Sequence, residues 1–150
     1  MTETFISNIT ELGIGSPYQP EEGDQAPGCM PPYEKKARIG CIYMSDNTAT
    51  WRRAKSKCED MGAQLIENPP LSSLLHYITK KGYGSTDFWV GGKFSDTWRW
   101  LDGQTITEGW NDGEPDYTTF TACVYFNWSG EGLLNDHLCT EKKKYICQIV

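Results

Sequence analysis

The sequence predicts a domain of the α+β class, in which two helices precede most of the strands. Two segments, 51–62 and 69–82, carry apolar residues at the three- and four-residue steps of an amphipathic helix. Other segments are short runs of aromatic and β-branched residues bounded by turn residues, which are typical of strands. The expected strands lie within 29–44, as two segments around a turn, and at 88–91, 98–100, 123–126 and 144–148. Because helices and strands do not alternate, this order favours an antiparallel sheet over a parallel one.

Each helical segment has its own start and stop signals. In the first, the Thr50 side chain can cap the start, and Gly62 suits the left-handed conformation that ends a helix. In the second, Pro69 or Pro70 can occupy the first turn, where a missing N–H costs no hydrogen bond, and Gly82 ends the pattern.

Composition divides the chain of 150 residues into two parts. Residues 1–28 hold five acidic residues and no lysine or arginine, are rich in Gly and Pro, and show no apolar periodicity. Such a segment buries too little surface to offset its ordering entropy, so we expect a flexible acidic tail. Residues 29–150 have the length of one domain, and we expect them to form the folded part.

Charge and hydropathy exclude two classes of function. The net charge of −6 argues against nucleic acid as a partner, because phosphate binding needs a clustered basic surface. No apolar run approaches the roughly 20 residues that cross a bilayer, so we expect no membrane span.

The chain contains six cysteines and no Cys-x-x-Cys pair. An even number of widely spaced cysteines in a short chain indicates disulfides in an oxidising compartment more than a zinc site. We therefore expect a secreted, extracellular protein. Spacing alone leaves 15 possible pairings.

A long stretch between Trp100 and Cys123 has little periodicity and is rich in Gly, Asp, Thr and Pro. Loops of this length are usually functional or disordered. The stretch contains Glu114-Pro115-Asp116, whose two acids lie on one loop and so do not suit the opposed carboxylates of a glycosidase. No nucleophile with a base and no catalytic metal motif is visible, so we expect a binding protein and not an enzyme.

A set of motifs spread over 29–150 is specific when taken together. They are Trp51-x-x-Ala54-x-x-x-Cys58-x-x-x-Gly62-Ala63-x-Leu65, Phe88-Trp89-Val90-Gly91-Gly92, Trp98-Arg99-Trp100-Leu101-Asp102-Gly103, Glu114-Pro115-Asp116, Cys123, Leu134-Asn135-Asp136, Cys139 and Cys147. With these motifs the sequence resembles the C-type lectin-like domain family in its long form. The resemblance implies two helices packed on short antiparallel sheets, with a long irregular loop. The tryptophans inside these periodic segments are expected in the core.

The resemblance also implies a pairing of the six cysteines. The pairs are Cys58 with Cys147, Cys123 with Cys139, and Cys29 with Cys41, the last being the extra amino-terminal bridge of the long form.

One calcium site is implied as well, because the family holds the ion with a Glu-Pro-x segment and an Asn-Asp pair. Carried over by position, the ligands are the side chains of Glu114, Asp116, Asn135 and Asp136, with the Asp136 backbone carbonyl as a further ligand. The resemblance also implies a cis Glu114–Pro115 bond. Oxygen donors of these kinds are the ligands that calcium prefers. In the family two adjacent sugar hydroxyls complete the shell, so the resemblance implies calcium-dependent carbohydrate binding.

Several positions depart from the pattern of the family's sugar binders. Thr121 stands where a carboxylate is usual and Leu134 where Trp is usual, while Asp116 replaces a neutral Asn and keeps three carboxylates at the site. Among nearby polar residues, we interpret Asn111 and Asp112 as loop polars or turn formers. His137 is interpreted as a loop or strand imidazole, with a pH sensor as the less favoured alternative.

The sugar class depends on the same motif. In the family Glu-Pro-Asn goes with mannose and Gln-Pro-Asp with galactose, and Glu114-Pro115-Asp116 is a hybrid of the two. We expect a preference for galactose, because Tyr117 offers an aromatic ring to the apolar face of that sugar. The alternative is that Tyr117 and Phe120 only pack the loop.

The expected partners are glycans of cell surfaces or glycoproteins, in innate immune recognition. Because single-site affinity is weak in lectins of this type, a homo-oligomer would supply avidity. The alternative function is a calcium-independent protein-interaction module, since many domains of this fold have lost the ion.

Overall fold

The computed structural model describes residues 28–83, 86–127 and 133–149. The chain divides into two units, Met1–Pro32 and Tyr33–Val150, and the described helices and strands lie in the second. Residues 1–27 of the expected acidic tail lie outside the described residues. The tail and its boundary therefore stay predictions.

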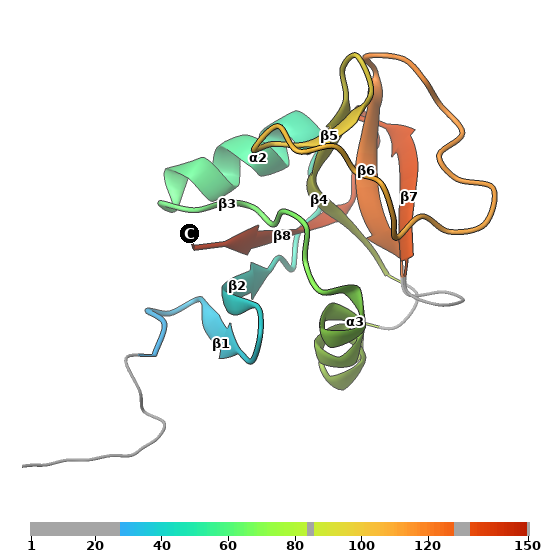
Figure 1. The fold of residues 1–150 in the computed structure, drawn as a ribbon. Helices are drawn as coiled ribbons and strands as arrows, with labels where there is room; N and C mark the ends of the chain where they lie inside the picture. Colours follow the sequence, from blue (N-terminus) through green and yellow to red (C-terminus); the bar gives the residue numbers. More distant parts are fainter. Residues whose placement is uncertain (1–27, 84–85, 128–132, 150) are drawn as a thin grey trace, which may run out of the picture. The chain divides into compact units, whose positions relative to one another are not determined.

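The described residues form two helices and eight strands, which confirms the predicted α+β class (Figure 1). The helices are α2 (Trp51–Asp60) and α3 (Leu71–Lys80). The strands are β1 (Glu34–Lys36), β2 (Gly40–Met44), β3 (Gln64–Leu65), β4 (Asp87–Phe94), β5 (Trp98–Trp100), β6 (Ala122–Asn127), β7 (Leu133–Leu138) and β8 (Lys144–Gln148). Neither described helix has the length and apolar character that crossing a bilayer requires.

The strands join in the order β1-β2-β8-β4-β6-β7, while β3 pairs with β8 and β5 pairs with β4. The described pairs are antiparallel except β4 with β8, which is parallel, with Phe88 opposite Lys144 and Trp89 opposite Tyr145. The predicted antiparallel arrangement is thus confirmed for the other described strand pairs, and this pair is the exception. Strands joined by a short hairpin must be antiparallel. Strand β8 follows β4 only after three further strands, β5, β6 and β7, so its direction is free of that constraint.

Both helices begin and end as their sequences predict. Thr50 Oγ1 accepts a hydrogen bond from the Arg53 N–H at 3.3 Å, and Gly62 follows α2 with a φ of +78°. Pro70 occupies the N-cap of α3, and Gly82 follows that helix with a φ of +81°. One face of each helix is buried, with Trp51, Ala54 and Cys58 on α2 and Leu74 and Ile78 on α3.

The core fills the space between α3 and the sheet. Its fully buried members include Leu74, Ile78, Phe88, Val90, Val124, Phe126 and Ile146. Trp51, Trp89, Trp98 and Trp100 are each at most 6% exposed, which confirms the expected core positions. The Trp51 indole N–H donates to the Val90 carbonyl and the Trp89 indole N–H to the Ala49 carbonyl, both at 2.9 Å. Two of the large rings are thus buried with their polar atoms satisfied.

Strand β7 was not predicted, although it pairs with β6 throughout, with Tyr125 opposite Asn135 and Val124 opposite Asp136. Asn135 and Asp136 are adjacent, polar and both buried. They break the alternation of apolar and polar residues by which a strand is predicted. The two-residue β3 is too short to carry such a pattern.

Two of the predicted disulfides are confirmed. They join Cys58 to Cys147 and Cys123 to Cys139, over sequence separations of 89 and 16 residues. Cys29 and Cys41 are each disulfide-bonded too, and none of the described cysteines is free. The pairing of these two with each other stays a prediction.

We predict that losing the Cys58–Cys147 bond destabilises the domain more than losing Cys123–Cys139. In the chain-entropy model, closing loops of 89 and 16 residues contributes about 4.5 and about 3 kcal/mol respectively. Denaturant unfolding of the two double Cys→Ala variants measures the difference. An equal or reversed order of stability would contradict the prediction.

Candidate functional site

The long loop between β5 and β6 is fastened to β7 by backbone hydrogen bonds. The Leu134 N–H donates to the Gly109 carbonyl at 2.8 Å, and the Asn111 N–H donates to the Leu134 carbonyl at 2.9 Å. The Trp110 ring packs edge to face against Trp98, with 5.3 Å between ring centres. Figure 1 shows this loop running out beside β6 and β7 before it returns to β6. The loop is therefore anchored at its middle, directly before the Glu-Pro-Asp segment.

Three carboxylates converge where this loop meets β7. Glu114 and Asp116 come from the loop and Asp136 from the strand, and one oxygen of each lies within 4.8 Å of the others. Within the described ranges no other three His, Cys, Asp or Glu side chains come together in this way. Like charges at such distances disfavour full ionisation, so the cluster needs a proton or a cation.

The Asp136 carboxylate shapes the loop. Its residue is 5% exposed, and it accepts the Asp116 N–H at 2.8 Å through Oδ1 and the Tyr117 N–H at 2.6 Å through Oδ2. Hydrogen bonds to an ionised acceptor are roughly twice as strong as neutral ones. Because each carboxylate oxygen has a second lone pair, both oxygens can still meet a cation.

Within the described part of the chain, Glu114 contributes to the cluster a buried oxygen without a hydrogen-bond partner. Its bond to Pro115 is cis, as the resemblance implied. Its Oε1 is buried and has no hydrogen-bond partner among the described residues. Burial, the neighbouring Asp136 carboxyl and the charge of Asp116 raise the pKa of Glu114 to about 7. Without a cation, this carboxyl therefore carries a proton below about pH 7.

Asn135 precedes Asp136 on β7 and is 6% exposed. Its Nδ2 donates to the Leu133 carbonyl at 3.2 Å, and its Oδ1 accepts from Asn111 Nδ2 at 3.4 Å. The Asn111 carbonyl also accepts the Glu114 N–H at 2.9 Å. Asn111 thus positions one expected ligand and the backbone of another, a role beyond the turn former that its sequence indicated. The Asn-Asp-Gly sequence directly before Glu114 indicated a turn, but no sequence signal indicated the contact with Asn135.

Aromatic side chains border the cluster. Tyr117 is 37% exposed, and its ring centre lies 6.4 Å from that of His137, whose ring is also 6.4 Å from Tyr125. His137 is thus an imidazole on a strand, one of the two placements expected for it. Phe120 is 75% exposed and therefore does not pack the loop.

The remaining residues singled out from the sequence do not join the cluster. Asp112 is an exposed loop residue. Thr121 contacts the Thr119 hydroxyl at 2.7 Å and lines a different cavity. Leu134 is 1% exposed and belongs to the core.

The donor set fits calcium by chemical type and by charge. Calcium takes about six to eight oxygen ligands. The three carboxylates, the amide oxygen of Asn135 and the Asp136 carbonyl are all oxygens, and carboxylates can each supply one or two. Positions remain for water or for hydroxyl groups of a ligand.

The sequence is similar to those of known proteins. A sequence model of the Lectin C-type domain matches residues 47–149. The C-type lectin domain family 4 member M of Symphalangus syndactylus is 29% identical over 119 residues, which covers 72% of this chain and 26% of that protein. The chain spans about a quarter to a half of the length of the first curated relatives it matches.

Solved structures share the fold. The mouse scavenger receptor C-type lectin carbohydrate-recognition domain matches with a TM-score of 0.66 at 27% identity, covering 80% of this chain and 96% of that one. A Ca2+-dependent type II antifreeze protein in its Ca2+-free form matches with a TM-score of 0.65 at 26% identity, covering 79% of this chain and 98% of that one.

We predict that calcium affinity falls as the pH falls from 8 to 6. Because the pKa of Glu114 is raised to about 7, a calcium ion bound at the cluster would have to displace a proton at the lower pH, which costs up to about tenfold in affinity per pH unit. Calcium titration calorimetry at both pH values measures the change. Equal affinities at pH 6 and pH 8 would contradict the prediction.

We predict that the calcium-free protein loses stability as the pH rises, because of the same raised pKa of Glu114. The folded-state pKa of Glu114 lies above its ordinary value, so this group's contribution to stability is complete at acidic pH. The contribution is lost as the pH rises through about 7. Unfolding of the chelator-treated protein, with Glu114→Gln as the control that lacks this titration, separates the effect from other groups.

Proposed function

This chain belongs to the C-type lectin domain family, and from that membership we propose that it is a calcium-dependent carbohydrate-binding protein. One calcium ion is held by the side chains of Glu114, Asp116, Asn135 and Asp136. Two adjacent hydroxyls of a sugar bind the same ion. The partners are glycans of cell surfaces or glycoproteins.

The convergence of three carboxylates from two separate segments supports this proposal most strongly. Asp136 lies on a sheet strand and is fixed by its register with β6, while Glu114 and Asp116 lie on the loop that Asp136 itself holds. The buried Glu114 Oε1 has no hydrogen-bond partner among the described residues. A divalent cation supplies that partner and offsets the repulsion within the cluster, whereas a proton does so only at lower pH.

Hydrogen-bonding chemistry of the ligands supports sugar as the further partner. The Glu114 and Asp116 carboxylates accept hydrogen bonds from sugar hydroxyls while they bind the ion. One N–H of the Asn135 amide donates to the Leu133 carbonyl, which leaves its second N–H for a hydroxyl oxygen. Vicinal hydroxyls that act both as donors and as acceptors match this set.

A galactose-type preference is the finer proposal. Tyr117 supports it, because its backbone is held by Asp136 and its ring is 37% exposed beside the carboxylates. Such a ring can cover the apolar face of a galactose while the hydroxyls on the other edge bind the ion.

The proposed setting is extracellular, in recognition of glycans by innate immunity. The disulfide bonding of the described cysteines supports this, because disulfides persist in oxidising compartments. Weak binding by each site favours a homo-oligomer, in which several sites engage one glycan surface.

Binding, and not catalysis, is the activity that we propose. Only Pro115 separates Glu114 from Asp116, so both carboxylates approach a ligand from the same side. Glycoside hydrolysis needs carboxyl groups that flank the bond. The rival function is a calcium-independent protein-interaction module, which the experiment below separates from a lectin.

We predict that Glu114→Gln and Asp136→Asn each abolish calcium-dependent binding to immobilised galactose. Each substitution removes a charged ligand of the ion. Mutating only a hydrogen-bond partner of a metal ligand typically costs about 10- to 100-fold in metal affinity, so we expect more than a hundredfold loss here. Calcium titration calorimetry followed by sugar titration measures both steps on one sample.

Asp112→Asn is the matched control, since Asp112 is an exposed acid of the same loop outside the cluster. It should bind calcium and sugar like the unmodified protein. Full sugar binding by Glu114→Gln, or glycan-array binding that a chelator leaves unchanged, would refute the calcium site. Calcium binding without any sugar binding would refute the lectin function alone.

We predict that free galactose competes better than free mannose for immobilised galactose, and that Tyr117→Ala weakens galactose binding. Loss of a stacking contact of about 1 kcal/mol corresponds to about fivefold in affinity. Phe120→Ala is the control, because it removes an equally aromatic but distinct ring of the loop. Stronger competition by mannose would overturn the preference, and unchanged affinity in Tyr117→Ala would remove its stacking basis.

A further inference from the structure

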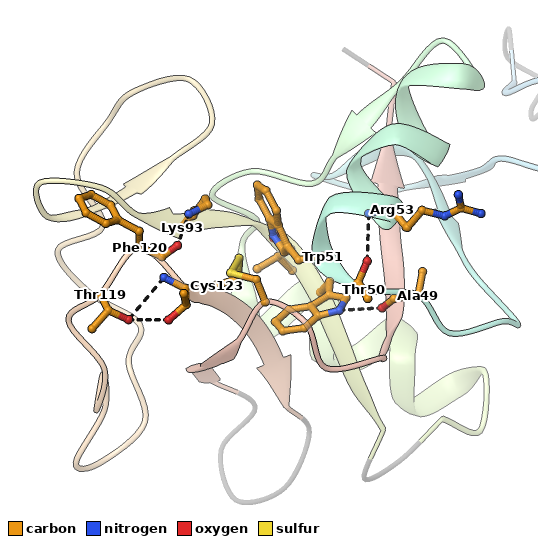
Figure 2. Close-up of a disulfide and its surroundings, with 12 residues drawn as sticks. Ala49, Thr50, Trp51, Arg53, Lys93, Thr119, Phe120 and Cys123 are labelled. Carbon is orange, nitrogen blue, oxygen red and sulfur yellow. Dashed lines mark hydrogen bonds between the residues drawn. A yellow bond between two sulfur atoms is a disulfide. The ribbon is translucent and has the colours of Figure 1, made fainter.

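A cavity lies beside the Cys123–Cys139 disulfide, between the start of α2, strand β4 and the end of the long loop. Figure 2 draws the disulfide with some of the residues that line the cavity, among them Thr50, Trp51 and Lys93. Its volume is about 350 Å³, within the range of roughly 300–1,000 Å³ that is typical of small-molecule sites. None of its lining residues belongs to the carboxylate cluster. The cavity is therefore a separate place on the molecule.

Two cations line this cavity and no carboxylate does. Lys93 comes from β4 and Arg52 from the first turn of α2. Across the part of the chain that the structure describes, neither forms an ion pair with an acidic residue. Burial and the charge of Arg52 lower the pKa of Lys93. The two charges thus repel each other in a partly desolvated place, and an anion between them would relieve the repulsion.

Lys93 keeps free hydrogen-bond donors at the cavity. Lys93 Nζ donates to the Phe120 carbonyl at 2.5 Å, which uses one of its three N–H groups. Figure 2 shows Lys93 and Phe120 side by side, with Trp51 across from them. The α2 helix has ten residues and points its N-terminal end at the cavity, where the helix dipole favours negative charge. Together these groups place positive charge and a hydrogen-bond donor at the cavity.

The walls favour an oxyanion that is attached to a ring. Phe120 is 75% exposed, and hydroxyl groups of Thr121 and Thr140 line the same cavity. Lys93 and Phe120 also line an adjoining cavity of about 430 Å³, so the space continues past the lysine. An aromatic ring beside hydroxyls and a cation is suited to the mixed apolar and polar faces of a saccharide.

We propose that this cavity binds an anionic saccharide, whose sulfate or carboxylate group lies between Lys93 and Arg52 and whose ring packs on Phe120. Binding at this site needs no calcium and does not depend on Glu114, Asp116 or Asp136. Binding at this cavity can therefore be measured independently of calcium-dependent sugar binding.

The test uses glucose 6-sulfate, glucuronate and glucose as probes of the full chain in the presence of EDTA. Titration followed by NMR or calorimetry should give saturable binding of one or both anionic sugars and none of glucose. Binding of glucose 6-sulfate alone identifies a sulfate site, and binding of glucuronate alone identifies a carboxylate site. Raising the salt concentration should weaken the binding, because both cations are partly exposed.

Variants locate the binding. Lys93→Gln and Arg52→Gln should each lower the affinity by about tenfold, because each removes a charged hydrogen-bond donor. Arg53→Gln is the matched control, since Arg53 is the next residue of α2, is exposed and does not line the cavity. Because Arg52 is exposed, its replacement leaves the core intact even if Lys93→Gln proves unstable. Equal binding of glucose, no binding of either anionic sugar, or an equal loss in Arg53→Gln would overturn the proposal.

Discussion

Two hydrogen bonds from the loop backbone to the Asp136 carboxylate are the constraint on which the candidate site depends. They join a segment without regular structure to a strand whose position is fixed by full pairing with β6. The hydrophobic core holds β6, the register of β7 places Asp136, and Asp136 then fixes the backbone that carries Asp116 and Tyr117. The sheet therefore determines where the carboxylates of the site lie, although Glu114 and Asp116 are on a loop.

The same arrangement has an energetic cost. A buried carboxylate among other carboxylates is unfavourable unless its charge is compensated, and the two backbone donors compensate it only in part. The Glu114 carboxyl responds with a pKa raised to about 7. The disulfides and the tryptophan-rich core supply stability elsewhere, so the domain can hold a site whose electrostatics oppose folding in the absence of a cation.

Local patterns predicted most of the fold. Both helices, with Thr50 and Gly62 as their boundary signals, and the strands around Trp89, Trp98 and Ile146 follow from periodicity. Strand β7 was not predicted, because its buried polar residues interrupt the alternation of apolar and polar residues. The parallel pairing of β8 with β4 was not predicted either, because it joins strands that are far apart in the sequence. At the site, the ligand residues came from a resemblance, while the contact of Asn111 with Asn135 spans 24 residues and has no signature in sequence. The same holds for Arg52 and Lys93, which only the folded chain brings to one cavity.

The segment after the Glu-Pro-Asp motif serves both candidate binding regions. Tyr117 borders the carboxylate cluster, and Phe120 lines the cavity that contains Lys93 and Arg52. Three residues of extended chain span at most about 11 Å, so the two regions are close together. A branched or extended oligosaccharide with a neutral terminal sugar and a nearby anionic group would reach from one region to the other. Its second contact would then form within the complex, at a high effective concentration, so one copy of the domain could discriminate modified glycans without clustering.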